Sequence, residues 1–327
     1  MSVYTHLNVQ DIHFLLAQYD IGELVSFTGI EDGVENTNYF VKVQKQGVEQ
    51  KYVLTLFEYL PEAALPFFID FTDELDRGGL PVPNPVRNQQ GNALHQVKEK
   101  PALIASCFKG GHIKELDIHH CQQIGQLLAK IHLIGQSSSL QQENQRGIHW
   151  LNDQQQRLQS LLKQEDADCM KQQWLSITEA LNQVQELPEG LIHGDLFHDN
   201  VLFDDDRITG VIDFYNACHD WLIYDLAVTA NDWCLNPDLT LDPLRCQALT
   251  MAYASIRPFT PEEQHIWPTM LRLAAFRFWV SRIITFIHPE EEVDNQHEQS
   301  LVRNFKDPDE FRDILMNRVH SNIPNLV

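Results

Sequence analysis

Several features that mark secreted and membrane proteins are absent from this 327-residue sequence. No two of its cysteines stand in a CxxC pair. The cysteines are Cys107, Cys121, Cys169, Cys218, Cys234 and Cys246. This scatter is typical of reduced thiols rather than of a disulfide framework. The N-terminal segment lacks the basic start and apolar stretch of a signal peptide, and no run of about 18 apolar residues occurs. We therefore expect a cytoplasmic protein that does not span a membrane.

Positive charge is also scarce. Lys and Arg together number 24 against 46 Asp and Glu, which gives a formal net charge of -22. Such a chain repels nucleic acid and anionic membranes, so we expect neither as a partner. The chain has enough apolar residues for two ordinary hydrophobic cores, because 43% of its residues are hydrophobic and 6 Trp, 17 Phe and 8 Tyr are present. The length exceeds that of a usual single domain, which predicts two lobes around a cleft.

The hydrophobic pattern divides the chain into a strand-rich first part and a mainly helical second part. In the first part, helices are expected at residues 8–20 and 61–77, and strands at 23–30, 37–43, 52–57 and 103–108. Lys109-Gly110-Gly111 then forms a hinge. Beyond it, helices are expected at 116–135, 150–186 and most of 221–287, a loop at 137–147, and short strands at 190–193, 201–203 and 208–213. This pattern predicts an α+β protein, with a small antiparallel sheet in residues 1–108 and a larger helical lobe in 109–327.

One segment carries residues suited to phosphoryl transfer. It reads His193-Gly194-Asp195-Leu196-Phe197-His198-Asp199-Asn200, and Asp213 follows after a hairpin. This reaction needs a carboxylate that accepts or orients the proton of the attacking hydroxyl, and oxygen ligands for magnesium. Asp195 can be that base. Asn200 and Asp213 can be the metal ligands, because the hairpin returns Asp213 to the same end of the site.

Structural explanations compete with these roles. Gly-Asp is ordinary turn chemistry, so the loop alone could be a turn with capping carboxylates. We expect His193 to be a hydrogen-bonded brace, and His198 could face a substrate. Two further clusters, His119-His120-Cys121 and Cys218-His219-Asp220, do not predict a zinc site, because adjacent ligands on a helix point apart and no second pair has matching spacing.

The set of Asp195, Asn200 and Asp213 resembles the kinase pattern HxDxxxxN with a downstream metal-binding Asp. Gly194 stands where protein kinases carry Arg, which resembles the superfamily of aminoglycoside phosphotransferases and choline kinases. The resemblance implies a two-lobed, protein-kinase-like fold that uses ATP and Mg²⁺. It assigns nucleotide covering to residues 1–108 and catalysis and substrate binding to 109–327. It also implies that Asp225 is structural, and that it ties down the catalytic loop.

In the first lobe, the turn at residues 33–40 resembles the nucleotide-covering loop of this superfamily. The resemblance implies nucleotide contacts from this turn, the third strand and the hinge. The residues are Gly33, Asn36, Thr55, Ser106 and Phe108. Thr55 is a departure, because most kinases carry a phosphate-binding Lys there. Lys42, Lys51 or magnesium alone could supply the missing charge.

A narrower resemblance comes from the strand VLTLFE, the loop HGDLFHDNVLF and the run GVIDFYNACHDWLIYDLA. These segments look like bacterial homoserine kinases of the choline-kinase-like type. The likeness covers most of the chain and is looser in residues 137–187. It implies ATP-dependent phosphorylation of the L-homoserine hydroxyl in threonine biosynthesis. Phosphorylation of methylthioribose, choline or an aminoglycoside remains an alternative, and so does a non-catalytic nucleotide-binding regulator.

Homoserine is a zwitterion, so its carboxylate needs a cation and its ammonium group an anion. The apolar segment 267–287 carries Arg272, Arg277 and Arg282, and a buried guanidinium is costly unless it is paired. Structural Arg–Asp bridges are as good an explanation for any one of them. The candidate substrate-binding residues are Asn38, His198, Tyr215, Arg277 and Arg282. The acidic run Glu290-Glu291-Glu292 keeps the aminoglycoside alternative open.

Overall fold

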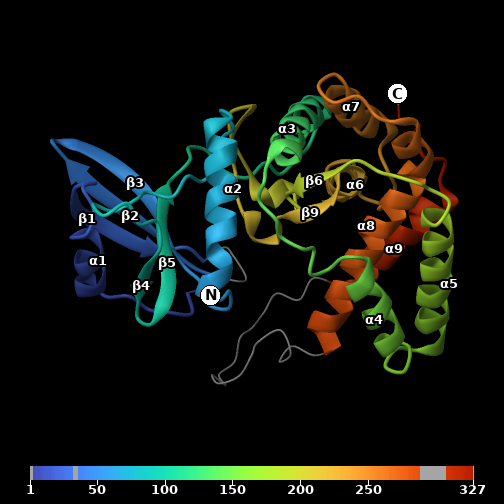
Figure 1. The fold of residues 1–327 in the computed structure, drawn as a ribbon, viewed down its shortest axis with the longest axis horizontal. Helices are drawn as coiled ribbons and strands as arrows, with labels where there is room; N and C mark the ends of the chain where they lie inside the picture. Colours follow the sequence, from blue (N-terminus) through green and yellow to red (C-terminus); the bar gives the residue numbers. More distant parts are fainter. Residues whose placement is uncertain (1–2, 32–35, 288–306, 327) are drawn as a thin grey trace. The chain divides into compact units, whose positions relative to one another are not determined.

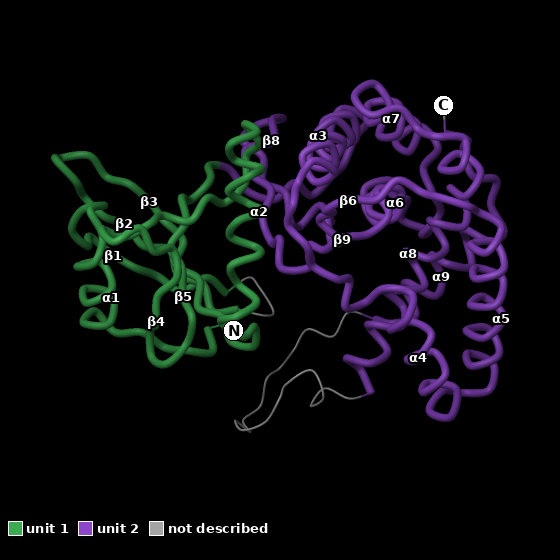
Figure 2. The backbone as a smooth tube through the Cα atoms, viewed as in Figure 1, with its two compact units in different colours: residues 1–109, 293–304 green, residues 110–292, 305–327 purple. Residues whose placement is uncertain are grey.

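The structure is a computed structural model that describes residues 3–31, 36–287 and 307–326. These residues form two compact units (Figure 2). The first unit ends at Lys109 and the second begins at Gly110.

The first unit is built on a five-stranded antiparallel sheet (Figure 1). Its strands are β1 (Glu23–Gly29), β2 (Thr37–Lys45), β3 (Val48–Leu56), β4 (His95–Val97) and β5 (Lys100–Ser106), in the order β1-β2-β3-β5-β4. Side chains on β2 alternate as its sequence predicts, since Tyr39, Val41 and Val43 are all buried. They share a core with helix α1 (Val9–Leu16), which Asn8 caps by accepting from the backbone amides of its first turn. A short 3-10 turn (Glu62–Ala64) and α2 (Leu65–Arg77) complete the unit.

The second unit is mainly helical. Its helices are α3 (Ile118–Ser137), α4 (Ile148–Leu158), α5 (Gln164–Leu181), α6 (Leu222–Trp233), α7 (Pro243–Ala254), α8 (Pro261–Ile287) and α9 (Pro308–His320). Two small antiparallel sheets accompany them: β6 (Glu189–Ile192) with β9 (Cys218–Trp221), and β7 (Val201–Asp204) with β8 (Arg207–Val211). One short 3-10 turn, His198–Asn200, follows the loop after β6, and another, Phe214–Asn216, follows β8. The antiparallel sheet and the helical part that the sequence predicted are therefore both present.

Several elements differ from the sequence prediction. The last apolar helix begins at Pro261 rather than at residue 267, and it continues through Pro268. Strands β4 and β9 and helix α9 were not predicted. Both strands are only three or four residues long, so they have too little alternation to be recognised. Helix α9 follows a segment with few apolar residues, and its buried face rests on only Phe311, Ile314 and Leu315 together with Arg318.

Two glycines let helix α3 approach its neighbours closely. A Cβ at Gly125 would lie 2.3 Å from the carbonyl oxygen of Leu249 on α7. A Cβ at Gly135 would lie 2.2 Å from the carbonyl oxygen of Leu191 on β6. Real side chains do not tolerate such distances, so α3 can pack against α7 and β6 only where glycine removes the Cβ.

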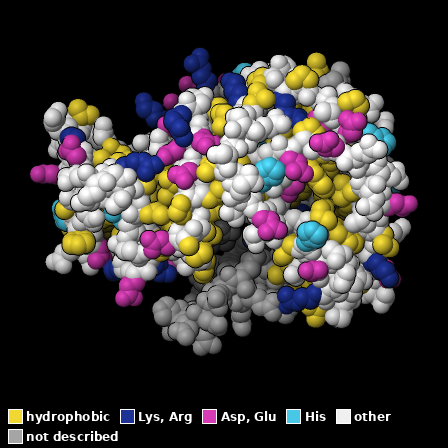
Figure 3. All heavy atoms as spheres, in the orientation of Figure 1, with side chains coloured by type: hydrophobic (Ala, Val, Ile, Leu, Met, Phe, Trp, Pro, Cys, Tyr) yellow, Lys and Arg dark blue, Asp and Glu magenta, His cyan; other side chains and the backbone are white. Residues whose placement is uncertain are grey.

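The surface is consistent with an acidic protein. Asp and Glu side chains are spread over the face shown in Figure 3 rather than gathered in one patch. Among the residues that the structure describes, no helix is both long and apolar enough to cross a membrane.

The close approach at Gly125 can be tested by substitution. Gly125→Ala should lower the free energy of unfolding by about 1–3 kcal/mol, the usual cost of overpacking, although alanine favours helix by up to about 1 kcal/mol. Denaturant titration measures the change. Gly111→Ala is the matched control, because a Cβ there meets no atom within 4 Å. A Gly125→Ala protein as stable as the control would contradict the packing argument.

Candidate active site

A buried carboxylate holds the loop that carries Asp195. Asp225 lies in the first turn of α6 and is completely buried. Its Oδ2 accepts the backbone N–H of His193 at 2.8 Å, and its Oδ1 accepts that of Gly194 at 2.9 Å. His132 on α3 places its Nε2 3.1 Å from the same Oδ2. Burial alone raises the pKa of Asp225, but the hydrogen bonds from the His132 ring and the His193 backbone hold it below its ordinary value.

The tautomer of His132 follows from its two partners. Its Nδ1 lies 2.6 Å from the hydroxyl of Tyr253, so that the hydroxyl donates to Nδ1 while Nε2–H donates to Asp225. Burial lowers the pKa of His132, which favours this neutral form. Asp225 therefore carries the charge of the pair.

The loop itself requires the residues at positions 193 and 194. Gly194 has φ +76°, and a Cβ there would lie 2.6 Å from the carbonyl oxygen of Asn216, so only glycine fits. His193 accepts the backbone N–H of Asp195 at its Nδ1, at 3.3 Å, and its Nε2 lies 3.1 Å from the carbonyl oxygen of Ile212. These two contacts make His193 a brace between the loop and the strand β8 that follows. They support the structural role proposed for it.

Helix α6 also holds the far end of the loop. Asp232 accepts from the backbone N–H of His198 at 2.7 Å and lies 2.8 Å from its Nδ1. The indole N–H of Trp233 donates to the carbonyl oxygen of Leu196 at 3.0 Å. Asp225 and Asp232 are about two helical turns apart, so both project from the same side of α6. The candidate substrate residue His198 is thus held through its Nδ1 by Asp232.

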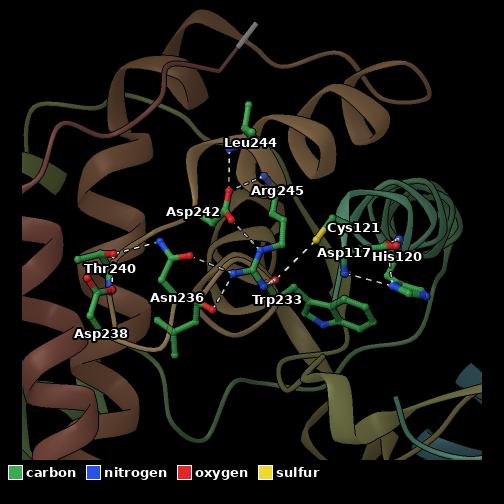
Figure 4. Close-up of polar contacts among 11 residues, drawn as sticks. Asp117, His120, Cys121, Trp233, Asn236, Asp238, Thr240, Asp242, Leu244 and Arg245 are labelled. Carbon is green, nitrogen blue, oxygen red and sulfur yellow. Dashed lines mark hydrogen bonds and ion pairs between the residues drawn. The ribbon is translucent and has the colours of Figure 1, made fainter. Parts of the chain in front are cut away.

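The end of α6 is in turn fixed by Arg245 (Figure 4). Its guanidinium donates to the carbonyl oxygens of Trp233 at 3.2 Å and Leu235 at 2.8 Å, and it pairs with Asp242 at 3.1 Å. The thiol of Cys121 on α3 approaches the Trp233 carbonyl oxygen at 3.6 Å. The carbonyl groups that a helix end leaves without helical partners are therefore satisfied here by side chains.

Asn200 and Asp213 are brought to the Asp195 loop by the β7–β8 hairpin. Val201 pairs with Val211, and the backbone N–H of Ile212 donates to the carbonyl oxygen of Asn200 at 2.9 Å. The side-chain NH₂ of Asn200 donates to the backbone carbonyl oxygen of Asp195 at 2.8 Å. Asp213 adopts a left-handed conformation with φ 64° and ψ 61°, which is uncommon outside glycine and is typical of constrained functional positions.

Asp195 is partly exposed, and its carboxylate has a neighbour in the turn that follows β8. Asn216 donates to its Oδ2 at 3.4 Å, and Arg146 donates to the amide oxygen of Asn216, also at 3.4 Å. Arg146 comes from the loop before α4. Tyr215, a candidate substrate residue, precedes Asn216, and burial followed by the charge of Asp213 raises its pKa.

The three arginines of α8 have different environments. Arg272 donates to Gln173 at 2.9 Å. Arg282 pairs with Glu310 and donates to the carbonyl oxygen of Asp307 at 3.0 Å, so its guanidinium is used to hold α9. Arg277 is buried and lies over the ring of Phe278 at 3.9 Å. Within the described ranges Arg277 has no hydrogen bond or ion pair to another side chain, and burial lowers its pKa.

The candidate nucleotide-binding residues lie in the first unit. Thr55 and Asn38 are opposite each other on β3 and β2, and the Thr55 hydroxyl donates to the Asn38 amide oxygen at 2.7 Å. The Asn38 NH₂ reaches the carbonyl oxygen of Asn36 at 3.5 Å. Ser106 ends β5, and Phe108 follows it. Gly33 lies outside the described residues, as does the acidic run at 290–292.

The two lysines that could replace the missing strand lysine already have contacts. Lys42 pairs with Glu49 at 3.4 Å, and the ammonium group of Lys51 lies 3.4 Å from the centre of the Phe40 ring. Lys51 is four residues from Thr55 along β3, or about 13 Å. A partly buried ion pair joins Lys100 at the start of β5 to Glu58, which follows β3. No sequence pattern pointed to that pair.

Other residues of the site were not predicted from the sequence. They are His132, Asn144, Arg146, Asn216 and Asp232. His132 stands on the buried side of α3 and could have been recognised as a polar interruption of an apolar pattern. Asn144 and Arg146 stand in a loop without periodicity, where no signal marks them.

A family model described as "Phosphotransferase enzyme family" matches residues 26–259. The chain is 43% identical over 284 residues to a homoserine kinase of Pseudomonas aeruginosa (strain LESB58), a match that covers 87% of this chain and 89% of that protein. It is 40% identical over 319 residues to a homoserine kinase of Methylobacillus flagellatus, covering 98% and 96% of the two chains.

Among solved structures, an amicoumacin kinase in complex with AMP-PNP, Ca²⁺ and Ami superposes with a TM-score of 0.69. That match covers 96% of this chain and 92% of the other, at 14% sequence identity. Because the identity is low, it bears on the fold alone. The prediction of an α+β, protein-kinase-like fold is confirmed.

The buried histidines predict how stability depends on pH. Burial lowers the pKa of His95, His132 and His193. In the unfolded chain each has a pKa of about 6.5, so below that pH the unfolded state binds protons that the folded state does not. The free energy of unfolding should therefore fall as the pH drops from 7.5 to 5.5, by up to about 1.4 kcal/mol per pH unit for each of the fully buried His132 and His193 and by less for His95, which is partly exposed.

Urea titrations at several pH values measure this slope. His132→Gln should reduce it, since one of the three groups is removed. His149→Gln is the control, because His149 is exposed on α4. Equal slopes for the wild type and His132→Gln would show that His132 is not held neutral.

Proposed function

The chain belongs to the phosphotransferase enzyme family, and we propose that it transfers the γ-phosphoryl group of ATP to the side-chain hydroxyl of L-homoserine, giving O-phospho-L-homoserine. The observation that carries the reaction type is the Asp195 loop, whose backbone is fixed by Asp225 and which has Asn200 and Asp213 beside it. The acceptor is supported by the homoserine kinases that match most of the chain. The proposal includes a cytoplasmic enzyme of threonine biosynthesis.

Asp195 is the proposed catalytic base. Its carboxylate is partly open to solvent, while the backbone that carries it is fixed at both ends of the loop by α6. It accepts the proton of the substrate hydroxyl as the oxygen attacks phosphorus. A fixed backbone matters, because phosphoryl transfer depends mainly on positioning and electrostatic stabilisation.

The proposed magnesium ligands fit the ion in their chemistry. Asp213 offers a carboxylate, and Asn200 offers an amide oxygen, because its NH₂ is already donating to the Asp195 carbonyl. Within the described ranges no three His, Cys, Asp or Glu side chains gather to hold a metal. One carboxylate and one amide agree with the way Mg²⁺ is usually bound, with nucleotide phosphates and waters as further ligands. The bound ion neutralises charge that develops on the phosphoryl oxygens.

Nucleotide contacts are assigned to the first lobe, residues 1–108, and catalysis and acceptor binding to residues 109–327. The nucleotide-binding residues remain Gly33, Asn36, Thr55, Ser106 and Phe108. The Thr55–Asn38 hydrogen bond gives that part of β3 a neutral polar surface. Arg277 is the proposed cation for the acceptor carboxylate, since it is buried and makes no ion pair with another described side chain. Arg282 is better explained by its contacts with α9.

Removing the base tests the reaction type. Asp195→Asn should reduce kcat by about 10²–10⁴-fold, the usual contribution of such groups, because it removes the proton acceptor. ATP binding, measured by calorimetry, should remain close to wild type. Asp205→Asn, in the exposed β7–β8 turn, is a control with the same change in charge. If Asp195→Asn keeps more than about a tenth of the wild-type rate, Asp195 is not the base.

Removing a ligand tests the metal site. Asn200→Ala and Asp213→Ala should each raise the half-saturating magnesium concentration at least about tenfold, a loss seen even when only a supporting residue is removed. Activity is titrated with magnesium at fixed ATP and homoserine. Asp213→Asn, which keeps the shape, should lie between the wild type and Asp213→Ala. Unchanged titration curves for all three variants would refute the assignment.

A further inference from the structure

A small pocket lies within the second unit, and its lining residue Arg146 is linked to Asp195 through Asn216. The loop before α4, strand β9, α6 and α8 all contribute to it. Its lining includes Asn144, Arg146, Asp220, Trp221, Tyr224 and Leu273. The free space holds about one water-sized group. A pocket of this size accepts a single small polar group rather than a whole substrate.

Asp220 is the anionic group in this pocket. Its carboxylate accepts the backbone N–H of Trp221 at 2.7 Å and the side-chain NH₂ of Asn144 at 2.5 Å. It has no ion pair with any residue that the structure describes. Burial raises its pKa, and the nearby Glu189 and Asp225 carry charge of the same sign and raise it further. A cation placed beside Asp220 would therefore be stabilised.

Asn144 is oriented to present its NH₂ to Asp220. Its amide oxygen accepts the backbone N–H of Arg146 at 2.8 Å, in a turn that ends at Gly147. The orientation of the amide follows, since the oxygen is used within the turn and the nitrogen faces the carboxylate. The turn thus fixes both the anion of the pocket and the position of Arg146.

One cation, Arg146, lines the same pocket as this anion. Burial raises the pKa of the Tyr224 hydroxyl in this pocket, Arg277 lowers it and Asp220 raises it further. Arg146 lines the same pocket and is linked to Asp195 through Asn216. A cation and an anion therefore line one small pocket, and two hydrogen bonds through Asn216 connect the cation to the proposed base.

We propose that Asp220, oriented by Asn144, binds the primary ammonium group of the acceptor, while Arg277 and Arg146 bind its carboxylate. This subsite rests on the proposed function and adds a rule of selectivity to it. A primary ammonium group is close to water in size and fits the pocket, whereas a trimethylammonium group is too large. An acceptor without an ammonium group leaves the Asp220 carboxylate without its cation.

The first test uses the wild-type protein with three acceptors: L-homoserine, 4-hydroxybutanoate and N,N,N-trimethyl-L-homoserine. Saturating ATP and magnesium are present, and ADP release is measured. We expect kcat/KM to fall by about 100-fold or more for each of the last two. With 4-hydroxybutanoate the buried Asp220 carboxylate has no ammonium partner, and the trimethylammonium group of N,N,N-trimethyl-L-homoserine is too large to enter the pocket. Equal use of L-homoserine and its trimethylated form would overturn the subsite without any variant.

The second test uses Asp220→Asn, with Glu189→Gln as the control. Glu189 is exposed, lies near Asp220 and carries the same charge, but it does not line the pocket. In Asp220→Asn the preference for L-homoserine over 4-hydroxybutanoate should fall from about 100-fold to near one, while the KM for ATP stays unchanged. Glu189→Gln should keep the full preference.

The outcomes separate the two proposals. If the wild type phosphorylates L-homoserine but Asp220→Asn keeps the wild-type preference, the subsite is wrong and the proposed function stands. If the wild type does not phosphorylate L-homoserine, the proposed function and the subsite fall together. If Asp220→Asn does not fold, the comparison of the three acceptors with the wild-type protein tests the subsite.

Discussion

The buried carboxylate of Asp225 is the constraint on which the rest of the second unit depends. An ionised group without solvent is costly, and here three donors compensate for it: two backbone N–H groups of the loop and the His132 ring. Because both amides must point at one carboxylate, the loop turns sharply, and glycine is required at position 194. The same hydrogen bonds therefore compensate the buried charge of Asp225 and fix the backbone of the loop.

The same constraint makes α6 a rigid support for the site. Asp225 holds one end of the loop, and Asp232 and Trp233 hold the other end about two turns later. Arg245 then satisfies the carbonyl groups where α6 ends. His132 extends the support to α3 and, through Tyr253, to α7. Asp195 is thus placed, through the backbone of its loop, by contacts from three helices.

The sequence predicted one half of the site better than the other, for a physical reason. Asp195, Asn200 and Asp213 belong to one loop and one hairpin, so their spacing along the chain reflects their spacing in the fold. The pocket around Asp220 combines a turn near Asn144, the end of β9 and the middle of α8, which are far apart in sequence. Only the fold brings them together. The main helices were predictable because their apolar faces are long, whereas β4 and β9 are stabilised by pairing partners that no local pattern reveals.

Charge gives the site a further constraint. The chain carries a net charge of -22, and ATP is itself a polyanion. At physiological ionic strength charges are screened over about 8 Å, so most of the surface carboxylates have little effect on the site. The phosphate charge of ATP must therefore be neutralised by cations close to the site. Thr55 supplies none, and Lys42 and Lys51 already contact Glu49 and the Phe40 ring. If Arg277 and Arg146 serve the acceptor, the proposed magnesium ion would have to neutralise a larger share of the phosphate charge than in kinases with a strand lysine. Under the proposed function, the uncharged Thr55 would then go together with a strong dependence on magnesium.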